Sequence, residues 1–348
     1  GGDMLVQSST QHPTEIQHKV AEALDLPMAR VRVETRRMGG GFGGKESQGN
    51  WLAVAAALVA ARTGRPAKMR YDRDDDMILT GKRHDFRIDY RAGVAQDGRV
   101  LGIEFVQYCR CGWSLDLSIP VADRAMLHAD NAYHLPDVRI VSHRLKTNTA
   151  SATAFRGFGG PQGMVAVERV MDHIAHRLGM DPLAVRTRNY YREAVPPAHP
   201  LTDEAEAHGA APTDGRGLVP GPAPAPVQTT PYGMPVEDFA LNEMTAALVD
   251  SADYHARRAA IRDWNAREPV LKKGIALTPV KFGISFTLTH LNQAGALVHV
   301  YQDGSIAMNH GGTEMGQGLF QKVAQVAASR FGVGIERVRI TATDTAKV

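Results

Sequence analysis

Residues 37–46, with the sequence Arg-Met-Gly-Gly-Gly-Phe-Gly-Gly-Lys-Glu, constrain this chain more than any other segment. Their glycines permit positive φ angles and let the backbone approach a ligand closely. Consecutive N–H groups in such a loop form a concave anion site, above all where a helix follows. The loop matches the dinucleotide-binding pattern G-x-G-x-x-G and also the first seven positions of a P-loop, but Glu46 stands where a P-loop has its Mg²⁺-binding Ser or Thr. Because a carboxylate repels a triphosphate, we expect a different ligand.

Two alternatives to this interpretation stay open. One is a P-loop or dinucleotide-binding protein, which would bind ATP or NAD tightly at this loop. The other is a purely structural glycine-rich turn. The flanking sequence predicts a strand over 31–34 and a helix over 45–62 that ends at Gly64. Apolar side chains on every side of that helix indicate that it is buried nearly all round; they are Trp51, Leu52, Val54, Leu58 and Val59.

Two further glycine-rich loops follow in the chain, over 153–162 and 310–318, and each precedes a predicted helix. Three such loops indicate one large anionic ligand that is held by backbone N–H groups from several directions. Arg156 in the second loop adds a fixed positive charge with bidentate geometry. Gln317 in the third loop offers both a donor and an acceptor.

Composition narrows the class of protein. A length of 348 residues predicts two domains, and 40 Lys and Arg against 37 Asp and Glu give no charge argument for nucleic acid or membrane partners. The sequence contains no apolar run long enough to span a bilayer. Its two cysteines, Cys109 and Cys111, are too few for a disulfide scaffold or a complete zinc site. We expect buried thiols and a cytoplasmic protein.

Periodicity predicts an α+β fold with strands and helices in mixed order. Residues 196–235 contain ten of the 19 prolines and predict a mobile linker or surface insertion. The expected division is therefore a first domain over 1–192, a linker over 193–235 and a second domain over 236–348. The expected elements are strands over 86–90, 100–108, 272–287, 297–309 (with a turn at 303–304) and 338–341, and helices over 162–178, from Asp181, over 236–264 and over 319–330.

Four segments, 37–46, 153–163, 281–287 and 311–318, resemble the molybdenum-binding part of the xanthine dehydrogenase and aldehyde oxidase family. The resemblance covers nearly the whole chain except the proline-rich insertion. It implies an α+β molybdopterin-binding domain in two parts, truncated here at both ends. It also implies a molybdenum–molybdopterin cofactor, with [2Fe-2S] clusters and FAD on a partner subunit or another part of a dimeric parent enzyme.

The resemblance assigns roles to the glycine loops. Phe42 and Arg156 would contact the molybdenum centre, and the pterin would lie along Gly41, Gly43, Met315, Gly316 and Gln317. Since the dithiolene of the pterin holds the metal, no Cys or His ligand is needed. This accords with an anion site made of backbone N–H groups and one arginine.

The resemblance also implies a purine site. Glu46 and Arg124 would hydrogen-bond opposite edges of the purine, Phe158 and Phe286 would hold its ring, and Thr287 would add a hydrogen bond. The implied activity oxidises hypoxanthine and xanthine to urate with oxygen from water, and passes electrons through Fe–S and FAD to NAD. Related aldehyde oxidases have apolar residues in place of the Glu and Arg, and an aldehyde-oxidising enzyme stays an alternative. Taken alone, Glu46 could be a helix N-terminal carboxylate and Arg124 a surface charge.

The family's general base, a glutamate in a Gly-x-Gly-Glu-Pro-Pro motif, is not found in this sequence, and we expect it beyond Val348. We therefore expect no catalytic residue in this chain, which alone would be inactive, and a non-catalytic fragment stays possible. The acidic run 72–76 predicts a solvated turn or helix start, and His173 and His176 predict surface positions and no zinc site. His310 is a weaker candidate for the cofactor site. The sequence leaves open whether NAD or O₂ accepts the electrons and whether the pterin carries a cytidine nucleotide.

Overall fold

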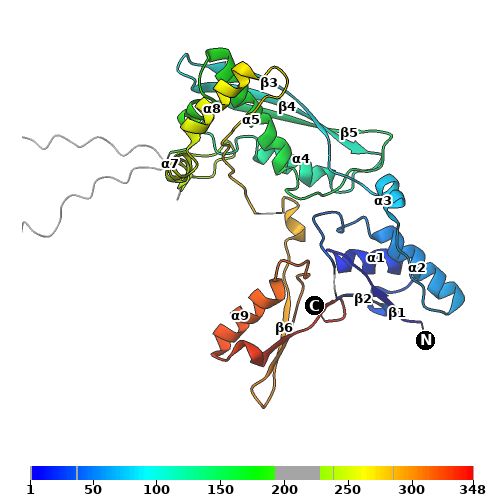
Figure 1. Ribbon diagram of the computed structural model, residues 1–348. Helices are drawn as coiled ribbons and strands as arrows, with labels where there is room; N and C mark the ends of the chain where they lie inside the picture. Colours follow the sequence, from blue (N-terminus) through cyan, green and yellow to red (C-terminus); the bar gives the residue numbers. More distant parts are fainter. Residues whose placement is uncertain (1, 37, 193–227, 238, 285, 348) are drawn as a thin grey trace, which may run out of the picture.

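The chain forms three separate three-stranded sheets with helices packed against them, in a computed structural model that describes residues 2–36, 38–192, 228–237, 239–284 and 286–347 (Figure 1). Each sheet combines one parallel pair of strands, joined by a connection that contains a helix, with one antiparallel strand. The predicted α+β class is confirmed. Parallel pairs need such long crossovers, which explains why helices lie between the paired strands in the sequence.

The first sheet has the order β1-β2-β9. Its elements are β1 (Met4–Gln7), α1 (Pro13–Leu24), a 3₁₀ turn (Met28–Arg30), β2 (Val31–Thr35), α2 (Asn50–Thr63), α3 (Arg73–Leu79) and β9 (Thr343–Asp344). Helix α1 joins the parallel strands β1 and β2 and buries Ile16 and Val20 against Val31 and Val33 of β2. Strand β9, near the end of the chain, pairs antiparallel with β2. The two ends of the sequence therefore meet in one sheet.

The second sheet has the order β3-β4-β5 and contains the longest strands. Its elements are β3 (Phe86–Val94), β4 (Val100–Gly112), α4 (Ser118–Leu127), β5 (Val138–Lys146), α5 (Gly160–Leu178) and α6 (Pro182–Asn189). Every second residue of β4 from Ile103 to Cys111 is buried, as the period of a strand requires. Helices α4 and α5 cover one face of this sheet (Figure 1). The predicted hairpin at Asp97-Gly98 and the predicted buried cysteines are confirmed.

The third sheet has the order β6-β7-β8. Its elements are a 3₁₀ turn (Thr289–Leu291), β6 (Ala296–Val300), β7 (Ile306–His310), α9 (Leu319–Phe331), a 3₁₀ turn (Ile335–Arg337) and β8 (Val338–Ile340). Strands β6 and β7 form the predicted hairpin around Asp303-Gly304, and α9 connects the parallel strands β7 and β8. The third glycine-rich loop therefore lies at the carboxyl end of β7, the position where α/β units bind ligands.

Three of the predicted elements are wrong in part. Helix α2 begins at Asn50, five residues after the predicted start, and buries only Ala53 and Ala57, whereas Trp51 is 66% exposed. Leu58 and Val59 are exposed as well, whereas Val54 packs against the core formed by α1 and β2. Residues 272–287, predicted as a strand, have no strand among their described positions, since the chain there runs without a ladder partner. The predicted helix over 236–264 is two helices, because Asp253 adopts a left-handed φ of 48°.

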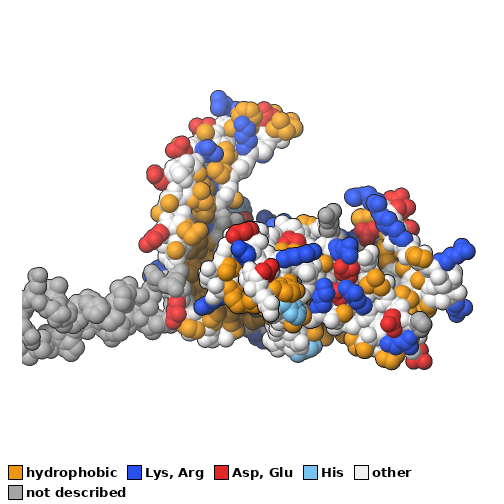
Figure 2. Space-filling model, turned by 90° about the horizontal axis from the view of Figure 1, so that it is seen from below, with side chains coloured by type: hydrophobic (Ala, Val, Ile, Leu, Met, Phe, Trp, Pro, Cys, Tyr) orange, Lys and Arg blue, Asp and Glu red, His pale blue; other side chains and the backbone are white. Residues whose placement is uncertain are grey.

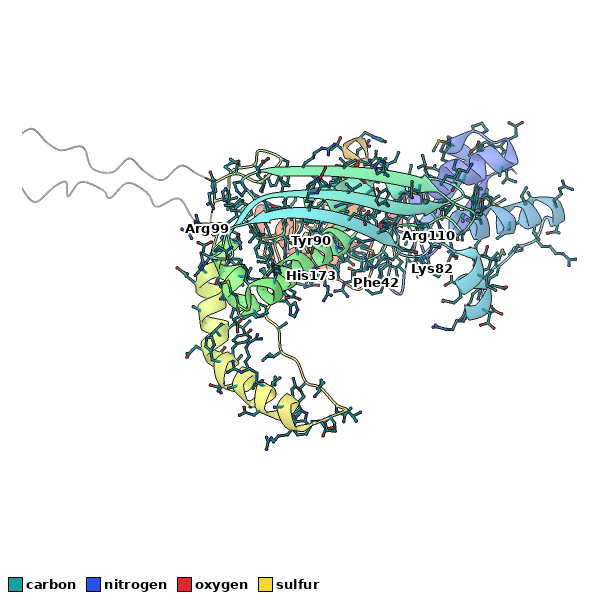
Figure 3. The ribbon with its side chains drawn as sticks, turned by 90° about the horizontal axis from the view of Figure 1, so that it is seen from above. Phe42, Lys82, Tyr90, Arg99, Arg110 and His173 are labelled. Atoms are coloured by element: carbon teal, nitrogen blue, oxygen red, sulfur yellow. The ribbon has the colours of Figure 1, made fainter. Side chains whose placement is uncertain are left out.

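Those two helices, α7 (Leu241–Ser251) and α8 (Tyr254–Arg267), extend away from the second sheet (Figure 3). Figure 2 shows them standing out from the body of the molecule with apolar side chains on their surface. Met244 and Leu248 of α7 are both exposed. Their base is tied to the second sheet by the ion pair between Arg258 and Asp181. Asp181 also caps α6 as predicted, since its Oδ1 accepts the N–H of Leu183 at 2.8 Å.

Most of the predicted linker, residues 193–227, lies outside the described residues. In its described end, residues 228–235, Thr230 is buried, and the carbonyl of Gln228 accepts the N–H of Val236 at 2.9 Å. The domain boundaries at 192 and 236 stay a prediction.

The expected position of the general base also lies outside the described residues. The sequence analysis expects this glutamate beyond Val348, and the structure describes the last segment of the chain only up to Lys347. Nothing in the described residues therefore tests where the base lies. That this chain contains no catalytic residue stays a prediction.

Candidate cofactor and substrate site

The three glycine-rich loops line one cavity of about 480 Å³. The first and third loops lie at the carboxyl ends of β2 and β7, and the second opens α5. Phe42 of the first loop lies toward the Arg110 end of β4 and away from Arg99 (Figure 3). The residues that line the cavity are Gln11, Gly41, Phe42, Gly43, Glu46, Phe155, Arg156, Gly157, Phe158, Met315, Gly316 and Gln317. All seven residues predicted along the cofactor are among them.

The first two loops share the sequence Gly-Phe-Gly-Gly and also share a conformation. Phe42 and Phe158 both have positive φ angles, 55° and 50°, and the glycines that follow them have φ of 93° and 96°. A bulky residue rarely adopts a left-handed φ, which costs on the order of 1–3 kcal/mol and is typical of functional sites. The matching strain on two phenylalanines that line one cavity therefore supports a binding role for both loops.

Close packing of backbone against backbone holds these two loops in place. A Cβ on Gly43 would lie 2.8 Å from the carbonyl carbon of Ala154, and a Cβ on Gly159 would lie 2.0 Å from the carbonyl oxygen of Val121. Only glycine permits these approaches. The first loop thus packs on the second, and the second packs on α4.

Gln11 also lines the cavity, a position that the sequence patterns did not predict. Its Oε1 accepts the N–H groups of Gly43 at 3.0 Å and Lys45 at 3.3 Å, so it supports the first loop from inside the cavity. The available signal was the polar run of residues 7–11, which follows the short strand β1 at its carboxyl end.

Lys45 does not face the cavity as a P-loop lysine would. Its ammonium donates to Ser9 Oγ at 2.8 Å and to the carbonyl of Met38 at 2.7 Å. Burial lowers its pKa. Since both bonds tie the lysine to the protein behind the loop, the structure does not favour the P-loop alternative.

The third loop differs from the predicted anion cradle, because its own side chains already occupy its N–H groups. Glu314 Oε1 accepts from Gly316 at 2.8 Å and Gly318 at 3.1 Å, and its Oε2 accepts from Phe320 at 3.0 Å. These backbone donors lower the pKa of Glu314. Gln317 Oε1 accepts from Met315 at 2.6 Å. Glu314 therefore caps α9, and this loop presents side chains and glycine Cα surface to the cavity.

Glu46, one of the predicted substrate residues, lies in the cavity wall and is partly buried. Burial, and to a smaller extent the charge of Asp116, raises its pKa to about 7. Gln48 holds Asp116 in place by a hydrogen bond of 3.0 Å. Glu46 is therefore neutral over much of the range below pH 7 and can donate a hydrogen bond to a ligand.

Arg124 is 6% exposed, so the surface-charge alternative is wrong. Its Nη1 donates to the carbonyl of Gly283 at 2.9 Å, and its guanidinium lies 5.7 Å from the ring centroid of Phe158 and 5.2 Å from that of Phe282. Its Nε has no hydrogen-bond partner among the described residues. A buried cation with an unpaired N–H is costly unless a ligand completes it.

The remaining substrate candidates come together only in part. Phe158 lines the cavity and Phe286 packs against it, with ring centroids 5.2 Å apart. Arg124 and Phe286 do not line the cavity themselves, but each lies against the ring of Phe158, which does. The Thr287 hydroxyl donates to the carbonyl of Pro120 at 2.9 Å, which ties it to α4.

Comparison with known proteins decides the family. Residues 1–190 match the family model of the molybdopterin cofactor-binding domain, and residues 247–348 match a second model of the same description. The chain belongs to the molybdopterin cofactor-binding domain family. The first match alone covers more than half of the chain, and the two together leave out the proline-rich region as the sequence predicted.

Named relatives of this molybdopterin-binding chain include the xanthine dehydrogenase of Drosophila subobscura, 41% identical over 98% of the chain, and the xanthine dehydrogenase/oxidase of Gallus gallus, 40% identical over 99%. The chain spans 23% of the length of each. Among solved structures it resembles the aldehyde oxidoreductase of Desulfovibrio gigas, with a TM-score of 0.70 and 22% identity over 98% of the chain and 34% of that protein. It also resembles quinoline 2-oxidoreductase of Pseudomonas putida 86, with a TM-score of 0.72 and 21% identity over 98% of the chain and 41% of that protein.

The residues of the cavity fit a molybdopterin cofactor. Gly316 has a φ of 101°, and a Cβ built on it would meet no atom within 4 Å, so this glycine leaves open space for a ligand in the cavity wall. Arg156 is exposed there and supplies positive charge for an anionic group. No group of three or more His, Cys, Asp and Glu side chains in the described parts of the chain could hold a metal ion directly.

The other candidate metal and cofactor residues have structural surroundings. The Asp72 side chain accepts the N–H of Asp75 and caps α3, as predicted for a helix start. His173 is exposed and bonds to the Tyr90 hydroxyl (Figure 3). His310 does not line the cavity; its Nδ1 accepts the N–H of Gly312 at 3.2 Å. No helix in the described residues combines the length and apolar character that a membrane crossing requires.

Proposed function

We propose that this chain forms the cofactor pocket and purine-binding wall of a molybdenum hydroxylase of the xanthine dehydrogenase type. The observation that carries the proposal is the pairing of a partly buried, protonatable Glu46 in the cavity wall with a buried Arg124 behind Phe158. Both polar groups suit a polar heterocycle, because a site that buries them would reject an apolar ligand strongly. The identity of about 40% to xanthine dehydrogenases supports the same assignment.

The cofactor would lie between the three loops. Gly41, Gly43, Met315, Gly316 and Gln317 would line the pterin, and Phe42 and Arg156 would face the molybdenum centre. Arg156 lies with its guanidinium carbon 6.0 Å from the ring centroid of Phe42, so the two side chains form one side of the cavity. When bound, the cofactor supplies the redox chemistry, in which oxygen from water enters the substrate and two electrons leave it.

The protein side chains would bind and orient the substrate. Neutral Glu46 would donate a hydrogen bond to a ring nitrogen or carbonyl of the purine. Arg124 would supply a fixed positive charge for the opposite, carbonyl-bearing edge, and its unpartnered Nε gives it an unused donor. Phe158, supported by Phe286, would pack on the ring face. Thr287, already bonded to α4, would act mainly by holding this segment in place.

The rest of the parent enzyme completes the activity. By this term we mean the assembly of this chain with the parts that its longer relatives contain. We propose that hypoxanthine and xanthine are its substrates and urate its product, and that [2Fe-2S] clusters and FAD elsewhere in a dimeric, cytoplasmic enzyme carry the electrons to NAD. We propose that another part of that enzyme supplies the general-base glutamate.

Replacing Glu46 and Arg124 with apolar residues in the parent enzyme tests whether this pair binds the purine. The double variant Glu46→Val with Arg124→Met should lower kcat/KM for xanthine by about a thousandfold or more, since the site loses both groups that would hydrogen-bond the purine. The matched control is Glu104→Val with Arg139→Met, which removes an ion pair of the same residue types on the outer face of the second sheet. Turnover that stays at the wild-type level in the first double variant would contradict the proposal.

A further inference from the structure

The segment 279–284 leads directly to Phe286 and Thr287, yet no strand ladder fixes it. Much of it is open to solvent: Val280 is 68% exposed and Ile284 is 95% exposed. An extended segment with so little apolar burial needs polar contacts to hold one conformation. The hydrogen bonds that hold it come from the short stretch 124–131, at the end of α4 and just beyond it.

The side-chain amide of Asn131 bonds to the backbone at the start of this segment through both its nitrogen and its oxygen. Its Nδ2 donates to the carbonyl of Pro279 at 2.9 Å, and its Oδ1 accepts the N–H of Lys281 at 3.0 Å. The residue is fully buried and has a left-handed φ of 44°, a conformation that asparagine tolerates better than most residues. The neighbouring Asp130 carboxylate, also buried, pairs with the Lys281 ammonium.

Asn131 is itself fixed by a buried network. Its Nδ2 also donates to Glu168 Oε1 at 2.9 Å, and the Tyr133 hydroxyl donates to the same oxygen at 2.6 Å. Arg186, which is 2% exposed, donates to the other oxygen of Glu168 at 2.7 Å. A satisfied buried network of this kind is rigid, so it transmits the position of α5 and α6 to the segment.

His128 holds the end of the segment. Its Nδ1 lies 2.9 Å from the carbonyl of Arg124, and its Nε2 accepts the N–H of Gly283 at 3.1 Å. These two bonds require the neutral tautomer with the proton on Nδ1. The ring packs on Phe282 with centroids 4.9 Å apart. Since Arg124 Nη1 donates to the carbonyl of Gly283, both backbone groups of Gly283 are bonded to α4 or its C-cap.

We propose that His128 and Asn131 are positioning residues that clamp the segment 279–284 and thereby set Arg124 and Phe286 for substrate binding. Neither residue lines the cavity or touches the substrate in this proposal. Their effect on the substrate rests on the proposed function, whereas the clamp itself does not. Loosening it should let the Arg124 guanidinium and the Phe286 ring adopt several positions, which weakens substrate binding more than it slows the chemical step.

Two variants and one matched control test the clamp in the parent enzyme. Asn131→Gly removes both bonds to the segment and still tolerates the left-handed φ. His128→Phe keeps a ring beside Phe282 and loses both of its hydrogen bonds. The control is Asn189→Ala, because Asn189 is also buried and its amide makes three bonds of 2.8 Å, to Gly98, Val100 and Val185, away from the segment.

The first readout is amide hydrogen exchange of Lys281 and Gly283, which needs no substrate. We expect about a tenfold faster exchange at Lys281 in Asn131→Gly and at Gly283 in His128→Phe, and wild-type rates at both in Asn189→Ala. Wild-type exchange in the two clamp variants would overturn the proposal, even if the parent enzyme proved to act on something other than purines.

The second readout separates positioning from general destabilisation. With molybdenum content equal to wild type, Asn131→Gly and His128→Phe should raise KM for xanthine about tenfold and change kcat by less than about threefold. Asn189→Ala should leave both constants near wild type. Equal changes in all three variants would show a merely structural role and would overturn the positioning claim. If the wild-type parent enzyme does not oxidise purines, the proposed function fails and the exchange result alone decides the clamp.

Discussion

The Gly-Phe-Gly-Gly loops and the third glycine-rich loop line the same cavity, but they use glycine for different reasons. In the first two loops, Gly43 and Gly159 allow one backbone to lie directly against another. In the third loop, Gly316 and Gly318 have positive φ angles and face open space, and Glu314 supplies the acceptor that holds their N–H groups.

This difference defines two parts of the site. The first two loops form its framework, and the third loop forms an adaptable wall. The first two loops are parts of the packed body, so a change there disturbs α4 and α5. In the third loop, the glycines at 316 and 318 are held by the Glu314 carboxylate of the same loop, so a change at these two positions should have little effect on the fold. A glycine-rich sequence alone does not tell these cases apart, because both require the same residue.

The largest expected difference comes from adding one methyl group to each kind of loop. Gly159→Ala would place a Cβ 2.0 Å from the carbonyl oxygen of Val121 at a φ of 96°, and should lower the free energy of unfolding by about 3 kcal/mol or more. Gly318→Ala, at a φ of 73° with no atom within 4 Å, should cost only about 1 kcal/mol. Calorimetric unfolding of both variants measures the contrast, and equal costs would remove the distinction between framework and wall.

A second contrast concerns the two carboxylates of the site. The pKa of Glu46 is raised to about 7 from an ordinary value of 4.5, so the folded protein binds its proton more tightly than the unfolded chain does. The free energy of unfolding of the wild type should therefore fall as pH rises from about 4.5 to 7. Because Gln does not titrate, the stability of Glu46→Gln relative to wild type should increase over the same pH range. Denaturant unfolding at several pH values measures this. A constant difference between the two proteins would show that Glu46 is not the group that titrates.

Glu314 should behave with the opposite sign. Its pKa is lowered from 4.5, so its contribution is fully present above that value and is lost as pH falls through the lowered pKa. At neutral pH, Glu314→Gln should speed amide exchange at Gly316 and Gly318, whereas below the folded pKa the variant and wild type should exchange alike. Exchange at Lys281, which belongs to another segment, serves as the internal control. No change at neutral pH would contradict the capping role of Glu314.

The sequence predicted which segments would meet, because the glycine patterns report local backbone requirements. The family resemblance then implied that Glu46, Phe42, Arg156 and Gln317 belong to one site, and all four line the same cavity in the structure. It did not predict Gln11, whose role depends on a turn brought next to the first loop by the pairing of β1 with β2.

The errors also have physical causes. The apolar surface of α2 predicted burial, but within the described residues no element covers Trp51. Residues 272–287 have the composition of a strand, yet the bonds of Asn131 and His128 take up the backbone groups that a ladder would use. Such competition between side chain and ladder depends on residues about 150 positions away, as the separation of Asn131 and Lys281 shows, and local patterns do not report it.

We propose that the three glycine-rich loops of this chain enclose a molybdenum–pterin cofactor. The most direct measurement is metal and pterin analysis of the purified parent enzyme, in wild-type form and with Gly316→Val, which would fill the open space in the cavity wall. We expect molybdenum and pterin in equal amounts in the wild type and a large loss of both in the variant, with little change in the free energy of unfolding. Absence of molybdenum from the wild-type enzyme, or full cofactor content in Gly316→Val, would contradict it.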